Sequence, residues 1–212
     1  MARSHAFVAD LALWIKHLQD RSETVVLRAA LREYQFAIVA LAFGQYRAAF
    51  AALRLSLELF LAAIRWSASE RELREWMRGE RDSNWATLID SENGVLSKNF
   101  IRLFSETLAD EAPSYSGTAA KLYRECSEFV HGNAHTHLEL PEQLAFSGPV
   151  FDSWQAKASS MRLVTSFALA ARYLSDLNTS SRSSLESMLL AHLGHSPGVR
   201  VLLGAPVEET HD

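Results

Sequence analysis

The stretch GQYRAAFAALRLSLELFLAAIRWS, residues 44–67, decides the fold class of this chain. After its first glycine it is rich in alanine and leucine, which are strong helix formers. Apolar residues occupy nearly every side of the resulting helix. We therefore expect this helix to lie at the centre of the molecule, with other helices packed around it.

The charged residues of this segment share one narrow stripe. At about 100° per residue, their intervals of seven, four and seven residues place them within roughly 40° of one another. They are Arg47, Arg54, Glu58 and Arg65. The sequence leaves two interpretations open: the stripe is the solvent-facing edge of the helix, or it lines a polar cleft or a dimer interface.

Apolar residues recur at helical spacing on both sides of this segment. Helices are predicted at about 5–20, 23–43, 69–81, 85–90, 95–108, 116–130, 151–177 and 181–193. Ser22 is the expected N-cap of the second of these helices, and Gly44 separates it from the third. A loop is predicted at 109–118, with Pro113 and Gly117 as breakers, and an irregular stretch at 134–150.

The predicted fold class is all-α: a single-domain helical bundle over residues 1–212 with two long central helices, 23–43 and 45–67. Its core spans about 23–178, and 204–212 is a frayed tail. A chain of 212 residues, 48% hydrophobic and 22% charged, has the length and balance of one globular domain.

Composition excludes several classes of protein. The net charge of −4 argues against a surface covered with nucleic-acid contacts, although a local basic groove remains compatible with it. Cys126 is the only cysteine, so an internal disulfide and a four-cysteine zinc site are excluded, and a reducing cytoplasm is the expected location. No uncharged apolar run reaches membrane-spanning length, so no membrane association is expected. Glycine-rich nucleotide motifs are absent, and no cofactor is expected.

The segment KLYRECSEFVHGNAHTH, residues 121–137, carries the densest group of reactive side chains. Arg124 and His131 are seven residues apart, which places them within roughly 20° of each other on one helix face. Lys121, Ser127 and Glu128 lie on or beside this face. Apolar surface that anchors the helix is expected from Leu122, Tyr123, Cys126, Phe129 and Val130. Gly132 is expected at the position just after the helix end.

An imidazole beside a guanidinium suits proton transfer near neutral pH and bidentate binding of a phosphate. Structural interpretations compete with this catalytic one. His131 could cap the negative end of the helix dipole, and Arg124 could form a salt bridge with Glu128 one turn further on.

An arginine followed by six residues and a histidine, near the end of a core helix, resembles the R-x4–6-H signature of HEPN domains. Upstream, GQYRAAFAALRLSLELFLAAI (44–64) is similar to the paired-helix region that precedes the motif helix in this family. The run YRECSEFVHGN and the downstream Trp154 resemble bacterial members of the same group. The resemblance covers roughly residues 40–155.

This resemblance implies a helical bundle that dimerises, with both protomers contributing to one cleft. It implies a metal-independent ribonuclease of a bacterial defence or toxin–antitoxin system, with RNA as substrate and an antitoxin or other partner protein. Arg124 and His131 would be the catalytic pair, with Arg47, Arg54 and Glu58 on the facing polar stripe. Many active members carry a small polar residue after the arginine, whereas this chain has Glu125. The family also contains non-catalytic members, so the alternative is a helical dimerisation module that binds a partner protein or a nucleotide.

The same segment, 121–137, contains residues for two other kinds of site, a metal site and a cysteine nucleophile. His131, His135 and His137 could hold a metal ion, but Gly132 interrupts the helix between the first two, so no metal site is predicted. Cys126 could act as a nucleophile, but it lies on a different helix face from His131, and a lone cysteine is more often buried.

Overall fold

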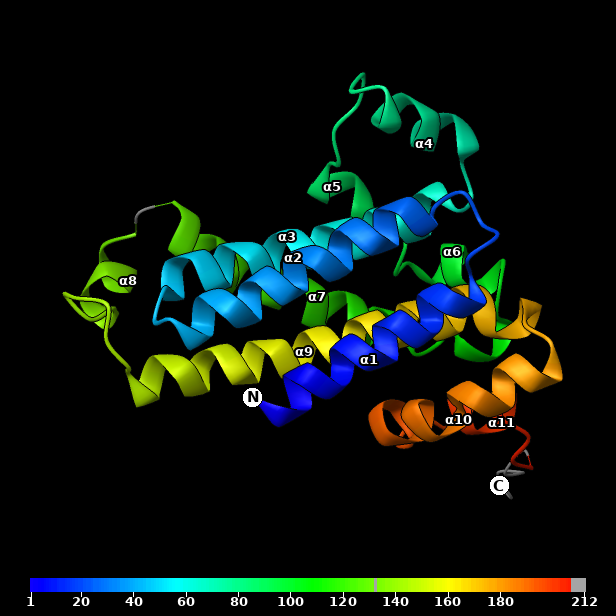
Figure 1. Ribbon diagram of the computed structural model, residues 1–212. Helices are drawn as coiled ribbons and strands as arrows, with labels where there is room; N and C mark the ends of the chain where they lie inside the picture. Colours follow the sequence, from blue (N-terminus) through cyan, green and yellow to red (C-terminus); the bar gives the residue numbers. More distant parts are fainter. Residues whose placement is uncertain (132, 207–212) are drawn as a thin grey trace.

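The central position of the 44–67 segment is confirmed by its packing. The computed structural model describes residues 1–131 and 133–206, and within them every regular element is a helix (Figure 1). The long helices are α1 (Ala2–His17), α2 (Thr24–Ala42), α3 (Tyr46–Trp66), α7 (Ala112–Val130), α9 (Gly148–Tyr173) and α10 (Thr179–Leu193). The all-α prediction is confirmed for the part of the chain that the structure describes.

Shorter helices connect these long ones. They are α4 (Glu70–Met77), α5 (Trp85–Leu88), α6 (Lys98–Arg102), α8 (Ala134–Glu139) and α11 (Pro197–Leu202), with 3-10 helices at Glu106–Leu108 and Leu174–Asp176. In Figure 1, α4 and α5 project from one side of the bundle, and α8 lies at one end of it. None of the helices described is both long and apolar enough to cross a bilayer.

Helix α3 packs against α2, α7 and α9, so three neighbours cover most of its surface. Small residues such as Ala49, Ala62 and Ala63 are fully buried along it and allow these neighbours to approach closely. Between α2 and α3 the chain reverses at Gly44, whose φ of 69° is a left-handed conformation that favours glycine. The bundle core is therefore built outward from α3.

Buried aromatic side chains join the remaining helices to this centre. Trp154 of α9 is fully buried, and its indole Nε1 donates a hydrogen bond to the carbonyl of Ala49 at 3.1 Å. Phe7 of α1 meets Tyr34 of α2 edge to face, with ring centroids 5.3 Å apart. These contacts place α1 and α9 on the core side of the α2–α3 hairpin.

The start of α7 corrects the predicted loop at 109–118. The helix begins at Ala112 and includes both residues that were expected to break it. Pro113 stands in the first turn, where its missing N–H is not needed and its ring favours the helical φ. Gly117 is exposed, and no atom outside its own helix turn lies within 4 Å of the place that a Cβ would occupy. The motif helix is therefore longer than predicted, with 19 residues.

Other boundaries also differ from prediction. The expected helix at 95–108 is shorter, because the Ser97 hydroxyl caps a new start by accepting from the N–H of Phe100 at 3.1 Å. The irregular stretch at 134–150 contains α8, whose N-cap is Asn133. Helix α2 begins at Thr24, with Glu23 rather than Ser22 in the cap position. Helix α11 was not predicted. The expectations for Gly132 and for 207–212 lie outside the described residues.

Candidate functional site

Arg124 of α7 and His131, its C-cap residue, are both exposed to solvent. Their separation of seven residues corresponds to about 10.5 Å along the helix axis. His131 is the C-cap residue, and its backbone N–H donates to the carbonyl of Ser127 at 3.1 Å. Neither the Arg124 nor the His131 side chain forms a hydrogen bond or ion pair with another described residue, so no salt bridge joins Arg124 to Glu128 there. Both side chains are therefore open to solvent.

Glu125 faces away from Arg124, towards α9. Its carboxylate lies 3.2 Å from the ammonium of Lys157 on α9 and 3.8 Å from that of Lys121 one turn earlier. Two lysines therefore balance the charge of the residue that departs from the R-x4–6-H family pattern. Lys121 and Glu128 are exposed on the same side of α7 as Arg124.

Ser127 lies on the opposite edge of this face and contacts α3. Arg54 donates from Nε to the Ser127 hydroxyl at 2.9 Å and from Nη2 to the hydroxyl of Tyr123. The Tyr123 hydroxyl donates in turn to the Glu58 carboxylate at 3.3 Å, and Ser83 donates to the same carboxylate at 2.6 Å. These five residues form a continuous polar seam between α3 and α7, which we call the α3–α7 seam.

The Tyr123 phenol is held in its neutral form. Burial raises the pKa of Tyr123, and the Glu58 charge raises this pKa further, against the lowering effect of Arg54. The Tyr123 ring stacks on Trp85 with centroids 3.7 Å apart, and the Arg54 guanidinium lies 4.2 Å above the ring. A neutral phenol can both accept a hydrogen bond from Arg54 and donate one to Glu58. The polar groups of the α3–α7 seam therefore find their hydrogen-bond partners within one chain.

The other two arginines of the α3 stripe are also engaged. Arg47 donates to the carbonyl of Phe129 at 2.6 Å, which neutralises the negative end of α7, and it contacts the His137 ring at 3.2 Å. Arg65 forms a bidentate pair with Glu72, with distances of 2.9 and 3.2 Å. The stripe is therefore directed at neighbouring segments of its own chain. Of the predicted site residues that the structure describes, Arg124, His131 and Glu128 have no side-chain hydrogen bond or ion pair.

The other two sites that the sequence suggested are not assembled. The described residues contain no group of three or more His, Cys, Asp or Glu side chains that could hold a metal ion. Cys126 is fully buried, and burial raises the pKa of its thiol to about 12. A buried, protonated thiol is a poor nucleophile.

The sequence interpretation missed the role of Tyr123, which it treated as apolar anchoring surface. The signal was present: Tyr123 and Ser127 are four residues apart, as are Arg54 and Glu58. Two such pairs on packed helices can face each other. What the sequence lacked was the knowledge that α3 and α7 are neighbours.

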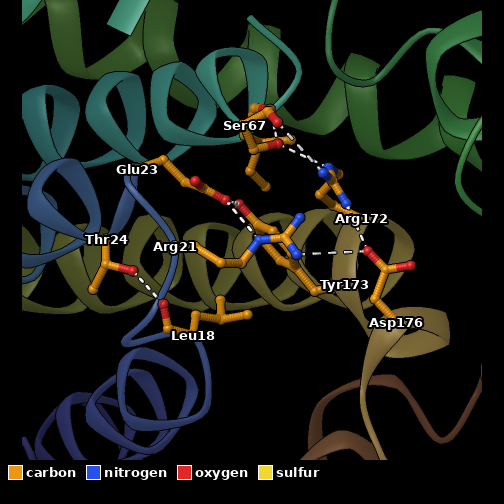
Figure 2. Close-up of polar contacts among 9 residues, drawn as sticks. Leu18, Arg21, Glu23, Thr24, Ser67, Arg172, Tyr173 and Asp176 are labelled. Carbon is orange, nitrogen blue, oxygen red and sulfur yellow. Dashed lines mark hydrogen bonds and ion pairs between the residues drawn. The ribbon is translucent and has the colours of Figure 1, made fainter. Parts of the chain in front are cut away.

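A second group of polar contacts lies where α2, α3 and α9 meet (Figure 2). Glu23, only 5% exposed, accepts hydrogen bonds from Arg21 Nε and from the Tyr173 hydroxyl, both at 3.0 Å. Arg172, only 7% exposed, donates to Ser67 at 2.7 Å and to Asp176 at 3.2 Å. Every charge of this buried cluster has an opposite charge or a hydroxyl beside it, so it stabilises the fold and leaves no group free for a ligand.

Comparison of the chain with protein-family models, with curated proteins and with solved structures finds no match. The function is therefore inferred from the geometry and chemistry of the residues themselves.

Proposed function

We propose that this chain is a HEPN-like, metal-independent RNA endonuclease that acts as a homodimer in the cytoplasm. Arg124 and His131 of the two protomers would form one composite site. The setting we propose is a bacterial defence or toxin–antitoxin system, in which a partner protein restrains the nuclease. The observation that carries the proposal is the pairing of an uncommitted arginine and an uncommitted histidine on one exposed helix face.

The surroundings of this pair favour an anionic substrate. An exposed guanidinium without a carboxylate partner can bind both oxygens of a phosphodiester. The nearest acid in sequence, Glu125, is drawn towards Lys121 and Lys157 and so adds little repulsion. Glu58, the acid of the α3 stripe, is buried in the α3–α7 seam. Glu128 remains exposed on the same side of α7, so a phosphate bound by Arg124 and His131 would lie beside this one carboxylate.

The proposed reaction is an attack by the RNA 2′-oxygen on the adjacent phosphorus. The bond from phosphorus to the 5′-oxygen breaks, leaving a 2′,3′-cyclic phosphate and a 5′-hydroxyl. One imidazole accepts the 2′-OH proton while a second imidazole donates a proton to the leaving oxygen. A dimer supplies these two imidazoles as its two copies of His131. Arg124 stabilises the charge that develops on the phosphorane oxygens.

Exposed apolar side chains support the dimer. Phe36 and Val39 of α2 are 54% and 53% exposed, and Phe43, the residue just after the helix end, is 71% exposed. Leu55 of α3 is 38% exposed. Of its two neighbours in the sequence, Arg54 contacts α7 and Ser56 donates a hydrogen bond to a carbonyl of α2. Exposed apolar side chains on neighbouring helices are typical of a protein–protein interface.

The test measures cleavage of single-stranded RNA by purified protein in the presence of EDTA. Arg124→Ala and His131→Ala should each lower the cleavage rate by about 100-fold or more, because each removes a group that acts in the transition state. Both side chains are exposed, so neither change should lower the melting temperature. DNA of the same sequence should stay intact, because it lacks the 2′-OH.

Matched controls are Arg78→Ala and His5→Ala, which remove an exposed arginine and an exposed histidine away from α7. Both should cleave RNA at the wild-type rate. Cleavage that survives His131→Ala would disprove the catalytic assignment. If the wild-type protein forms a dimer and cleaves no RNA, the non-catalytic dimerisation module is the better interpretation, and the same two variants should then alter binding or dimer formation.

A further inference from the structure

A second ligand site is suggested by a pocket whose lining contains no residue of α7. Helices α1, α9 and α10 line an open pocket of about 890 Å³. Sites for small molecules typically occupy roughly 300–1,000 Å³. Four serines line this pocket: the hydroxyls of Ser160 and Ser184 donate to backbone carbonyls of their own helices, and those of Ser159 and Ser187 have no hydrogen bond to a described residue. Its size and its hydroxyl lining suit a small polar molecule with several hydrogen-bond acceptors.

Arg162 of α9 is the unusual residue in this lining. It is only 7% exposed, and its Nη1 is buried without a hydrogen-bond partner. No described carboxylate forms an ion pair with it. The Tyr34 hydroxyl lies near Arg162; burial raises the pKa of Tyr34, and the Ser4 hydroxyl and the Arg162 guanidinium partly oppose that effect. A buried guanidinium without a counter-charge costs free energy, and an anion in the pocket would remove that cost.

The remaining charges of the pocket favour an anion. Arg3 of α1 supplies a second guanidinium from the exposed end of the lining. Asp10 is the one carboxylate among the lining residues, and it is already hydrogen-bonded to His192 Nε2 at 2.8 Å. The lining therefore offers two guanidinium groups to a ligand and one carboxylate that is occupied.

We propose that this pocket binds a small organic phosphate. Arg162 would hold the phosphate oxygens at the buried end, with Arg3 closing from the surface. Two guanidinium groups and the hydroxyls of Ser159 and Ser187 offer more donors than the two oxygens of a carboxylate can accept, whereas a phosphate monoester has three peripheral oxygens and a larger charge. Leu163 and Met188 give the organic part an apolar surface to pack against.

The test follows the melting temperature and the heat of binding of the full chain. The probe is glucose 6-phosphate, compared with glucose, with sodium acetate and with sodium chloride at matched ionic strength. Glucose 6-phosphate should raise the melting temperature in proportion to the logarithm of its concentration, since it binds only the folded state. No stabilisation beyond that given by chloride would overturn the proposal. Equal stabilisation by acetate would overturn the choice of phosphate.

Variants locate the site. Arg162→Met should be at least as stable as wild type without ligand, because it removes an unpaired buried charge, and should weaken binding by about tenfold or more. Arg3→Gln changes an exposed side chain, so it tests the site even if the core variant folds poorly, and it should weaken binding by about three- to tenfold. Arg28→Gln, at an exposed arginine outside the pocket, should bind as wild type.

The double variant Arg124→Ala and His131→Ala separates this site from the proposed nuclease. Binding of glucose 6-phosphate should persist in it, because neither residue lines the pocket. Loss of binding in this variant would assign the phosphate to the α7 face and overturn the proposal. Wild-type binding by Arg162→Met would show that Arg162 does not hold the phosphate and would overturn it as well.

Discussion

The reactivity of the Cys126 thiol measures how well this residue is buried. Its side chain is fully enclosed in the face of α7 that meets the core, and burial raises the pKa of the thiol to about 12. At pH 8 only about one thiol in ten thousand would then be ionised, and the thiolate is the reactive form. The single cysteine of the chain therefore reports on the integrity of the core.

We expect Cys126 to resist alkylation by iodoacetamide at pH 8 in the native protein. In urea concentrations that unfold the chain it should react fully, because the pKa returns to its ordinary value and the thiol is exposed. Mass spectrometry of the protein after timed labelling measures both. Rapid labelling in native buffer would contradict the buried placement of this thiol.

Glu23 gives a prediction about stability at the same scale. Its carboxylate is nearly buried and accepts hydrogen bonds from Arg21 and Tyr173. Glu23→Gln keeps the volume but removes the charge, and should lower the free energy of unfolding by about 2 kcal/mol. For a chain of this size, that loss corresponds to a fall in melting temperature of about 4–8 °C.

The control for Glu23→Gln is Glu70→Gln. Glu70 pairs with Arg74 on the surface of α4, where both side chains are about two-thirds exposed, at 64% and 66%. Its loss should change the free energy of unfolding by no more than about 0.5 kcal/mol, because water screens an exposed pair. Urea unfolding of the two variants measures the difference. Equal effects would show that the buried cluster contributes no more than a surface pair.

At the scale of the helices, periodicity predicted most elements well. The three N-terminal long helices were placed within a few residues, because their apolar positions recur at regular spacing. The errors fall where one residue has two structural roles. Pro113 starts α7 although proline in mid-helix ends one, and Ser97 caps a new helix inside a stretch with helical character. Helix α11 spans only six residues, too few for a periodic signal.

Periodicity also limited what could be inferred about the candidate site. It placed Arg124 and His131 on one face of their helix, and it placed Arg54 and Glu58 in one stripe. The angle around a helix axis does not say which neighbour a face meets. The α3–α7 seam therefore could not be predicted, and the uncommitted state of Arg124 could be recognised only once the partners of the other arginines were known.

At the scale of the whole molecule, buried phenols predict how stability responds to alkaline pH. The pKa values of Tyr34, Tyr115, Tyr123 and Tyr173 are all raised, chiefly by burial, that of Tyr115 to about 12. The unfolded chain loses these protons near pH 10, while the folded chain keeps them to higher pH. The folded state therefore binds more protons in this window, and its stability must fall as pH rises through it.

The free energy of unfolding should decrease from about pH 10 upward, by up to about 1.4 kcal/mol per pH unit for each such tyrosine. The loss should continue until the folded-state phenols ionise, near pH 12 for Tyr115. Urea unfolding at several pH values measures this slope. Absorbance at 295 nm follows phenolate formation, and a native titration in which all five tyrosines ionise near pH 10 would refute the prediction.

The buried contacts of α9 also govern the order in which this chain can mature during synthesis. Tyr173 is 150 positions from Glu23, its hydrogen-bond acceptor, and Trp154 is 105 positions from Ala49. At ordinary elongation rates, about 5–20 s pass between the appearance of Ala49 and that of Trp154. Throughout that interval the core side of α3 lacks the helix that covers it. The nascent chain therefore carries an uncovered apolar hairpin, and chaperones that bind such surfaces should engage it until α9 has emerged from the ribosome.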